Sequence, residues 1–154
     1  MSFDGSLDLF GKRSVLFLPA SNPRAIDKAR RAGADLVILD LEDAVKPEDK
    51  DAARQAAMDA VAEQWEMPVG IRVNGLASDL IEADLAAVAA SNADFVVLPR
   101  ADSAESIEAV WERVQRGVLA MIETAAGVLA APEIAREVAG LIAGTSDLAA
   151  DLRL

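Results

Sequence analysis

The sequence has no cysteine and no histidine among its 154 residues. Without cysteine there can be no disulfide and no thiolate zinc site, and a reducing, cytoplasmic setting is expected. Without histidine, the chain excludes a Ser–His or Cys–His nucleophile, a histidine general base and imidazole metal ligands. Acid–base chemistry in this chain must therefore rest on carboxylates, lysine, arginine-tuned groups or water.

Basic residues and long apolar runs are also scarce. Lysine and arginine number 15 against 26 acids, which gives a net charge of −11 and disfavours nucleic acid as a partner. The simplest interpretation of this net charge is a solvated acidic surface without a functional role. No apolar run approaches the ~18 residues of a membrane span, so no membrane partner is expected. Residues 1–12 also lack the basic and apolar regions of a signal peptide.

Six short apolar runs are spaced along the chain, and they predict strands. They cover residues 13–18, 36–39, 69–73, 95–98, 117–122 and 140–143. The runs are continuous rather than alternating, which is typical of parallel strands covered on both faces. Segments of helical character separate them, at about 23–33, 48–65, 79–90, from Ser103, and 124–138, with a sixth helix expected to begin at Leu148.

The length predicts one domain, with residues 1–12 as a loosely packed N-terminal arm and residues 13–154 as the α/β domain. The spacing alone leaves two architectures open, an open doubly wound sheet and part of a barrel. A closed (β/α)₈ barrel typically needs ~250 residues. An unclosed barrel would leave strand edges and apolar surface bare, which favours association between chains.

Two carboxylates follow neighbouring strands of this pattern. Glu123 comes directly after the run 117–122, and Asp147 follows the run 140–143. The carboxyl ends of parallel strands share one face, where α/β proteins bind ligands. Two oxygen ligands beside water and substrate suit Mg²⁺. The competing interpretation is that each acid caps or precedes a helix without any metal.

The series of strand-end motifs resembles one protein family. It runs Phe17-Leu18-Pro19, Leu39-Asp40-Leu41-Glu42-Asp43-Ala44-Val45, Arg72-Val73-Asn74, Val97-Leu98-Pro99-Arg100, Met121-Ile122-Glu123-Thr124-Ala125 and Gly144-Thr145-Ser146-Asp147-Leu148. In this order it is similar to the citrate lyase beta subunit and its CitE-like relatives, in the HpcH/HpaI aldolase group. The resemblance implies a TIM (β/α)₈-type barrel, here an incomplete barrel of about six βα units. The family's last two barrel units and its C-terminal segment have no counterpart in this sequence.

The resemblance also implies roles for individual residues. Glu123 and Asp147 match the family's Mg²⁺ ligands and, with Arg72, its catalytic residues. The residues matching positions that bind substrate or line the pocket are Arg13, Arg72, Arg100, Asp40, Glu42 and Asp43. Arg100 stands where the family usually has lysine. A structural ion pair is the alternative for Arg72, and helix capping is the alternative for the three acids after the second strand.

Family members cleave or form a carbon–carbon bond in 3-hydroxyacyl thioesters of the citryl, malyl or citramalyl type. The products are an acetyl-type thioester and a 2-oxo acid such as oxaloacetate. The resemblance thus implies a lyase, Mg²⁺ as cofactor, CoA or an acyl carrier protein as thioester carrier, and a homo-oligomer (trimer or hexamer). A Schiff-base mechanism is disfavoured because the lysines, at 12, 28, 46 and 50, end none of the predicted strands. Two alternatives stay open: a catalytically incomplete or non-catalytic oligomerising fragment, and a CoA-independent metal-dependent aldolase.

Overall fold

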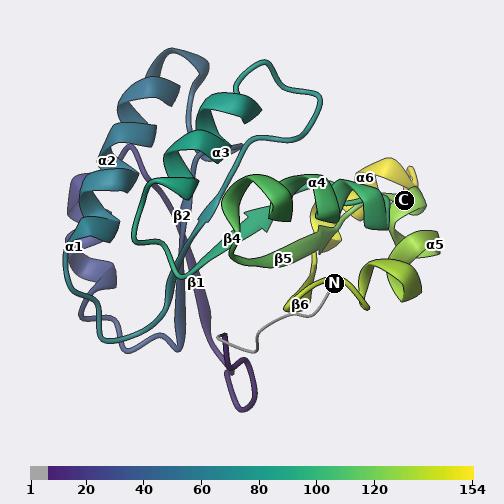
Figure 1. Ribbon diagram of the computed structural model, residues 1–154, viewed down its shortest axis with the longest axis horizontal. Coiled ribbons are helices and arrows are strands. Elements are labelled where there is room, and N and C mark those ends of the chain that lie inside the picture. Colours follow the sequence, from purple (N-terminus) through teal and green to yellow (C-terminus); the bar gives the residue numbers. More distant parts are fainter. Residues whose placement is uncertain (1–6) are drawn as a thin grey trace.

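A computed structural model describes residues 7–154, in which strands and helices alternate (Figure 1). The strands are β1 Val15–Pro19, β2 Leu36–Asp40, β3 Val69–Arg72, β4 Phe95–Leu98, β5 Gly117–Ile122 and β6 Gly140–Ala143. The helices are α1 Pro23–Ala29, α2 Lys50–Ala62 with the 3₁₀ turn η1 Pro47–Asp49 before it, α3 Ile81–Ala89, α4 Ala104–Val114, α5 Ala125–Ile134 and α6 Thr145–Asp151.

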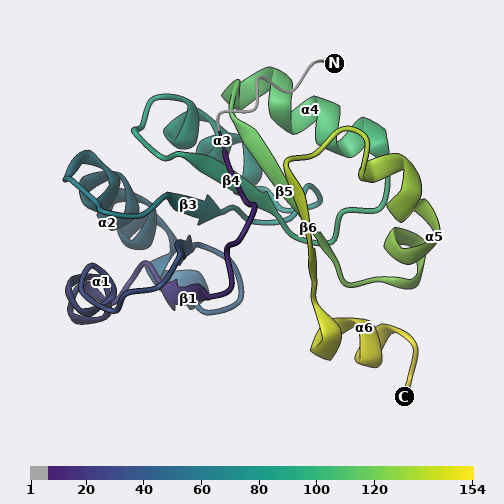
Figure 2. The same ribbon diagram turned by 90° about the horizontal axis from the view of Figure 1, so that it is seen from below.

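The order of the strands decides between the two architectures. All six strands are parallel, and their order in the sheet is the same as their order in the chain. A doubly wound sheet reverses its strand order at a switch point, whereas a (β/α) barrel adds each strand beside the last. Figure 2 shows the sheet curling, with its helices on the outer side. The described chain is therefore an incomplete barrel, with β1 and β6 as its edges.

Strand side chains alternate between two apolar layers. The larger layer lies between the sheet and the helices. The smaller one lines the concave side and consists of Leu7, Leu36, Ile38, Phe95, Val97, Leu119 and Met121. Gly70 shares this side, and a Cβ there would lie 2.2 Å from the Phe95 ring. The glycine thus leaves the space that the aromatic ring fills, which accounts for a glycine inside a buried strand.

Three helices begin at side-chain caps that the sequence contains. Asn22, Ser103 and Thr124 each accept a hydrogen bond from the backbone N–H three residues later, at 3.1, 3.2 and 3.0 Å. Such caps satisfy backbone donors that have no partner within the helix. Ser103, from which the sequence predicts the fourth helix, is the N-cap of α4.

Several predicted boundaries were wrong. The first helix ends at Ala29 rather than at Gly33, because its last backbone hydrogen bonds already close at Arg30. The helix predicted over 48–65 covers 50–62, and the one predicted over 124–138 covers 125–134. The sixth helix begins at Thr145, three residues before the predicted Leu148. This last shift places Asp147 in the first helical turn instead of a loop.

Residues 7–12, the described part of the predicted N-terminal arm, contact the half-barrel through two leucines and are otherwise exposed. Residues 1–6 lie outside the described part of the chain, so the prediction applies here only to residues 7–12. Leu7 is buried and Leu9 packs against the concave apolar layer, close to Gly140 of β6. These two leucines lie at the amino-terminal end of the half-barrel. Within residues 7–154, no helix combines the length and apolarity required to cross a membrane.

Candidate functional site

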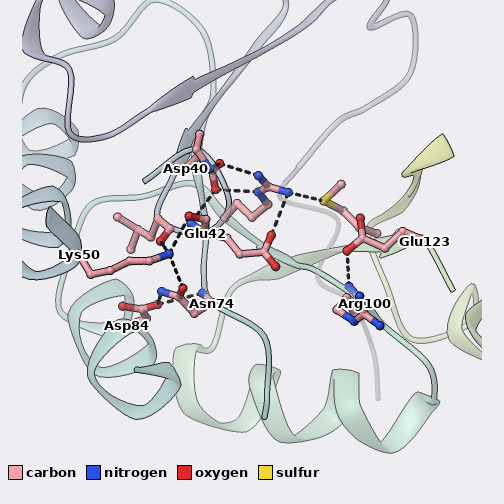
Figure 3. A network of polar contacts seen from close by, with 11 residues as sticks. Asp40, Glu42, Lys50, Asn74, Asp84, Arg100 and Glu123 are labelled. Atoms are coloured by element: carbon pink, nitrogen blue, oxygen red, sulfur yellow. Dashed lines mark hydrogen bonds and ion pairs between the residues drawn. The ribbon is translucent and has the colours of Figure 1, made fainter. Parts of the chain in front are cut away.

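Alternation along the strands brings charged side chains together at the carboxyl end of the concave face. Asp40 ends β2, Arg72 ends β3, and the two residues are paired in the register of the sheet. Glu123 follows β5 and continues the inward series of Leu119 and Met121. Side chains two residues apart on a strand share a face, so these groups are directed to the same side. Figure 3 shows Asp40, Glu42 and Glu123 gathered there.

Asp40 is fully committed to internal contacts. Its Oδ1 accepts from Arg72 Nε at 2.7 Å and from the Glu42 backbone N–H at 2.8 Å. Its Oδ2 accepts from Arg72 Nη2 at 2.5 Å and from the Ala44 N–H at 3.1 Å. The residue is 1% exposed. Asp40 therefore holds Arg72 and the following loop, and these contacts occupy both of its oxygens.

Arg72 has a second acidic neighbour. Its Nη1 lies 2.9 Å from Glu42 Oε2 and 3.8 Å from the Met121 sulfur. Burial lowers the pKa of Arg72, but the hydrogen bond and charge of Asp40, with the charge of Glu42, outweigh it and leave the pKa raised. The guanidinium therefore stays charged. The ion-pair alternative for Arg72 is present in the structure, with Asp40 and Glu42 as its partners.

Glu42 is a carboxyl group that burial keeps partly protonated. Burial raises its pKa to about 7, against the lowering effect of Arg72, and the charges of Asp43, Glu123 and Asp40 raise it further. Its Oε2 is buried and makes an ion pair with Arg72, but without hydrogen-bond geometry. Asp43 is exposed and acts on the cluster through its charge. At neutral pH, the contact of Glu42 with Arg72 is consequently weaker than that of Asp40.

Glu123 is buried, at 2% exposed, and only one of its oxygens is used. Its Oε1 accepts from the Arg100 backbone N–H at 2.7 Å, while its Oε2 has no hydrogen-bond partner among the described residues. A Cβ on Gly144 would lie 2.5 Å from that free oxygen, so the glycine makes room for the carboxylate. Burial raises the pKa of Glu123, the Arg100 N–H lowers it, and the charge of Asp147 raises it. The net direction is upward.

Arg100 contributes through its backbone. Its φ of 50° lies in the left-handed region, which is uncommon for a residue other than glycine. In this conformation its N–H meets Glu123 Oε1, while its side chain is exposed and lowers the Glu123 pKa by its charge. Such backbone outliers often accompany functional sites.

Glu123 and Asp147 fit a divalent cation such as Mg²⁺. Asp147 is exposed in the first turn of α6 and close enough for its charge to act on Glu123. A buried carboxylate oxygen without a partner, near a second carboxylate, matches the hard oxygen donors that Mg²⁺ prefers. Within the described range, no group of three or more His, Cys, Asp or Glu side chains could hold a metal. Water and substrate would have to complete the coordination.

The structure does not bring Arg13 to this cluster. Arg13 precedes β1, at the amino end of the strands, whereas the cluster lies at their carboxyl ends. Its backbone N–H donates to Asp35 at 2.9 Å, and the residue is exposed. Asp151, which is exposed, accepts from the Ala125 N–H at 2.8 Å and joins α6 to the start of α5.

Sequence reasoning missed a polar network beneath the cluster, made by Lys50, Asn74, Asp84 and Arg54. Asp84 is 0% exposed. A signal for it was present, because Ile81, Asp84, Leu85 and Val88 follow the helical spacing of a buried stripe. An acid on such a stripe predicts a buried polar partner, although its position in the sequence gives no indication of which one.

Comparison with known proteins agrees with the geometry. The family model described as HpcH/HpaI aldolase/citrate lyase matches residues 13–154. A (3S)-malyl-CoA thioesterase of Cereibacter sphaeroides is 40% identical over 145 residues, covering 91% of this chain and 51% of the relative. A citrate lyase subunit beta-like protein of Mycobacterium tuberculosis is 41% identical over 139 residues, covering 89% and 49%.

A solved structure from M. tuberculosis, the citrate lyase beta subunit complexed with oxaloacetate and magnesium, superposes with a TM-score of 0.80. It is 36% identical, and the match covers 96% of this chain and 65% of that one. The chain thus spans about half the length of the two relatives named above. It belongs to the HpcH/HpaI aldolase/citrate lyase family.

Proposed function

We propose that this member of the HpcH/HpaI aldolase/citrate lyase family contributes to a Mg²⁺-dependent carbon–carbon lyase site. The reaction is the cleavage of a 3-hydroxyacyl thioester of the citryl, malyl or citramalyl type. Its products are an acetyl-type thioester and a 2-oxo acid such as oxaloacetate. The observation that carries the proposal is the free, buried Oε2 of Glu123, on the same concave face as Arg72 and near Asp147. The M. tuberculosis relative solved with oxaloacetate and magnesium supports it.

Each residue of the site has a separate role in this proposal. Glu123 and Asp147 would hold Mg²⁺, which when bound stabilises negative charge on the oxygens of a 2-oxo acid. Arg72, held in place by Asp40, would pair with a carboxylate of the substrate. Glu42 is the weaker partner of Arg72 and would stay beside it, bordering the side from which a substrate carboxylate approaches. Asp43 and the Arg100 side chain would adjust the charge at the rim of the site.

Thioester hydrolysis is a second candidate, favoured by the 40% identity to a malyl-CoA thioesterase. In that reaction water cleaves the thioester and releases the hydroxy acid and the free thiol, with the carbon skeleton intact. A lyase breaks the carbon–carbon bond and keeps the thioester. The two activities therefore differ in their products with one and the same substrate. A third candidate is a CoA-independent 2-oxo acid aldolase. It would act on free acids and not on thioesters.

A homo-oligomer, trimer or hexamer, is also part of the proposal. The non-catalytic alternative predicts an oligomer without turnover. Size-exclusion chromatography with light scattering tests assembly, and a monodisperse monomer would contradict the oligomer.

Calorimetric titration with MgCl₂ tests the cation site directly. We expect binding by the native chain and at least a tenfold loss of affinity in Glu123→Gln and Asp147→Asn. Glu108→Gln, on an exposed face of α4, serves as the control and should bind as the native chain does. Native-like Mg²⁺ affinity in Glu123→Gln would refute the assignment.

Incubation with malyl-CoA, citramalyl-CoA and free 4-hydroxy-2-oxo acids, followed by mass spectrometry of the products, then identifies the reaction. Acetyl-CoA with a 2-oxo acid indicates the lyase, and free CoA with a hydroxy acid indicates the thioesterase. Cleavage of free acids alone indicates the aldolase. Mg²⁺ binding without any product supports the non-catalytic alternative.

A further inference from the structure

Lys50, the first residue of α2, places its amine under the loop that carries Glu42 (Figure 3). Its Nζ donates to the backbone oxygens of Leu41 and Glu42, at 2.6 and 2.7 Å, and to Asn74 Oδ1 at 2.8 Å. A lysine ammonium has three donors and no acceptor. All three protons of Lys50 are therefore used, and two of them hold consecutive carbonyls of one loop.

The third acceptor is itself fixed by a buried acid. Asp84 Oδ2 accepts from the Asn74 backbone N–H at 2.9 Å and from its Nδ2 at 2.6 Å. The amide of Asn74 can then present only its oxygen to Lys50. Asp84 Oδ1 in turn accepts from Arg54 Nε at 2.7 Å. The chain of contacts thus runs from α3, through the end of β3, to the loop after β2.

We propose that Lys50 is a positioning residue, which sets the loop after β2 so that the Glu42 carboxylate lies against Arg72. Asp40 already holds Arg72 from the other side, and it also accepts hydrogen bonds from the backbone N–H groups of Glu42 and Ala44. The amine fixes the carbonyls of this loop, while Asp40 fixes its N–H groups. With both sets held, Arg72 faces the site in one orientation. The functional consequence rests on the proposed function, because it concerns the binding of a 2-oxo acid carboxylate.

This role differs from the usual uses of a lysine in an aldolase-like site. A Schiff-base lysine needs a free amine facing the substrate. The Lys50 amine instead contacts three acceptors at the back of the loop. Its effect on a substrate must pass through Glu42 and Arg72. It should consequently change the affinity for a carboxylate anion and leave the cation site at Glu123 unaffected.

Chemical rescue gives a specific test, because the native chain contains no cysteine. Lys50→Cys removes the amine, and alkylation with 2-bromoethylamine restores a side chain of nearly the same length with an ammonium at its end. Alkylation with iodoacetamide is the neutral control. Lys46→Cys, at an exposed lysine on the same loop, receives both treatments as the positional control.

Calorimetric titration measures the affinity for Mg²⁺ and, with Mg²⁺ present, the affinity for oxaloacetate. We expect Lys50→Cys to bind Mg²⁺ within about twofold of the native chain and oxaloacetate at least tenfold more weakly. Aminoethylation, but not carbamidomethylation, should restore oxaloacetate affinity. Unchanged oxaloacetate affinity in Lys50→Cys, or equal rescue by the neutral reagent, would overturn the proposal.

Hydrogen exchange tests the positioning without any ligand. We expect the Glu42 and Ala44 amides to exchange at least tenfold faster in Lys50→Cys, with Ala120 on β5 unchanged, and aminoethylation to reverse the difference. Uniform acceleration at all three amides would mean that Lys50 only stabilises the fold. No acceleration would also overturn the proposal. If the native chain binds neither Mg²⁺ nor oxaloacetate, the proposed function fails, while this exchange pattern still decides the role of Lys50.

Discussion

Gly144→Ala is the sharpest test of the geometry around Glu123. Gly144 is the residue before α6 and has φ −87° and ψ 75°, with φ on the side that residues with side chains normally adopt. The substitution therefore adds one methyl group without demanding a left-handed backbone. That methyl group would meet Glu123 Oε2 at 2.5 Å and Glu123 Cβ at 2.6 Å.

The size of the effect follows from these distances. Carbon atoms in contact lie about 3.5–4.0 Å apart, so the two Cβ atoms would overlap by roughly 1 Å. The Cβ of Glu123 is fixed to the end of β5 and cannot rotate away, so the strand end or the turn before α6 must shift. Overpacking of this kind costs about 1–3 kcal/mol. A shift of this size would separate the two carboxylates, and we expect Mg²⁺ affinity to fall at least tenfold.

Urea unfolding and calorimetric Mg²⁺ titration measure the two effects. Gly75→Ala is the matched control, because a Cβ there would meet nothing within 4 Å. The control should unfold and bind as the native chain does. Native-like stability together with native-like Mg²⁺ affinity in Gly144→Ala would refute the close approach of Glu123 to the turn before α6.

Two further predictions concern Arg72 and its partners. The folded-state pKa of Glu42, about 7, lies above its ordinary value of 4.5. Between these values the folded state keeps a proton that the unfolded state has lost, so the free energy of unfolding falls as pH rises from about 4.5 to 7. At roughly 1.4 kcal/mol per pH unit the loss is on the order of 3 kcal/mol. Urea titrations at pH 5 and 8 should show this loss in the native chain, and its persistence in Glu42→Gln would contradict the assignment. Arg72→Met leaves the buried Asp40 without its charged partner, and the free energy of unfolding measured in urea should fall by about 3–5 kcal/mol. Arg113→Met, which breaks the exposed pair with Glu82, should cost under about 1 kcal/mol, and equal losses would disprove the structural importance of the Arg72 pair.

The strands were predictable because each is a short, continuous apolar run. The barrel was harder to predict, since doubly wound sheets and barrels share the same βα spacing, and only the ordered strand-end motifs pointed to one of them. The sequence also indicated that Glu123 and Asp147 end up on one face. It could not show that Asp147 lies within a helical turn, because the start of α6 depends on the backbone at Gly144.

The contacts within the site were the least predictable part. The sequence marked Asp40, Glu42 and Asp43 as one acidic motif, but the fold gives the three side chains separate surroundings. Strand parity turns Asp40 inward against Arg72, Glu42 is half-buried, and Asp43 is exposed. The contact from Lys50 to Asn74 joins residues 24 positions apart, and the one from Arg54 to Asp84 joins residues 30 apart. Such pairs depend on which helices lie side by side, and this emerges only from the folded chain.

The sequential order of the strands also bears on how the chain folds. The acid–arginine pair joins β2 to β3, within the interior of the sheet, whereas Glu123 and Asp147 join β5 to the outermost described unit, β6 and α6. An edge unit opens more easily than the strands inside a sheet. A divalent cation held across this boundary would bind only the closed form, and so would selectively suppress fraying of that edge. The same ion that is proposed to serve catalysis would thereby also stabilise the packing of β6 and α6 against β5.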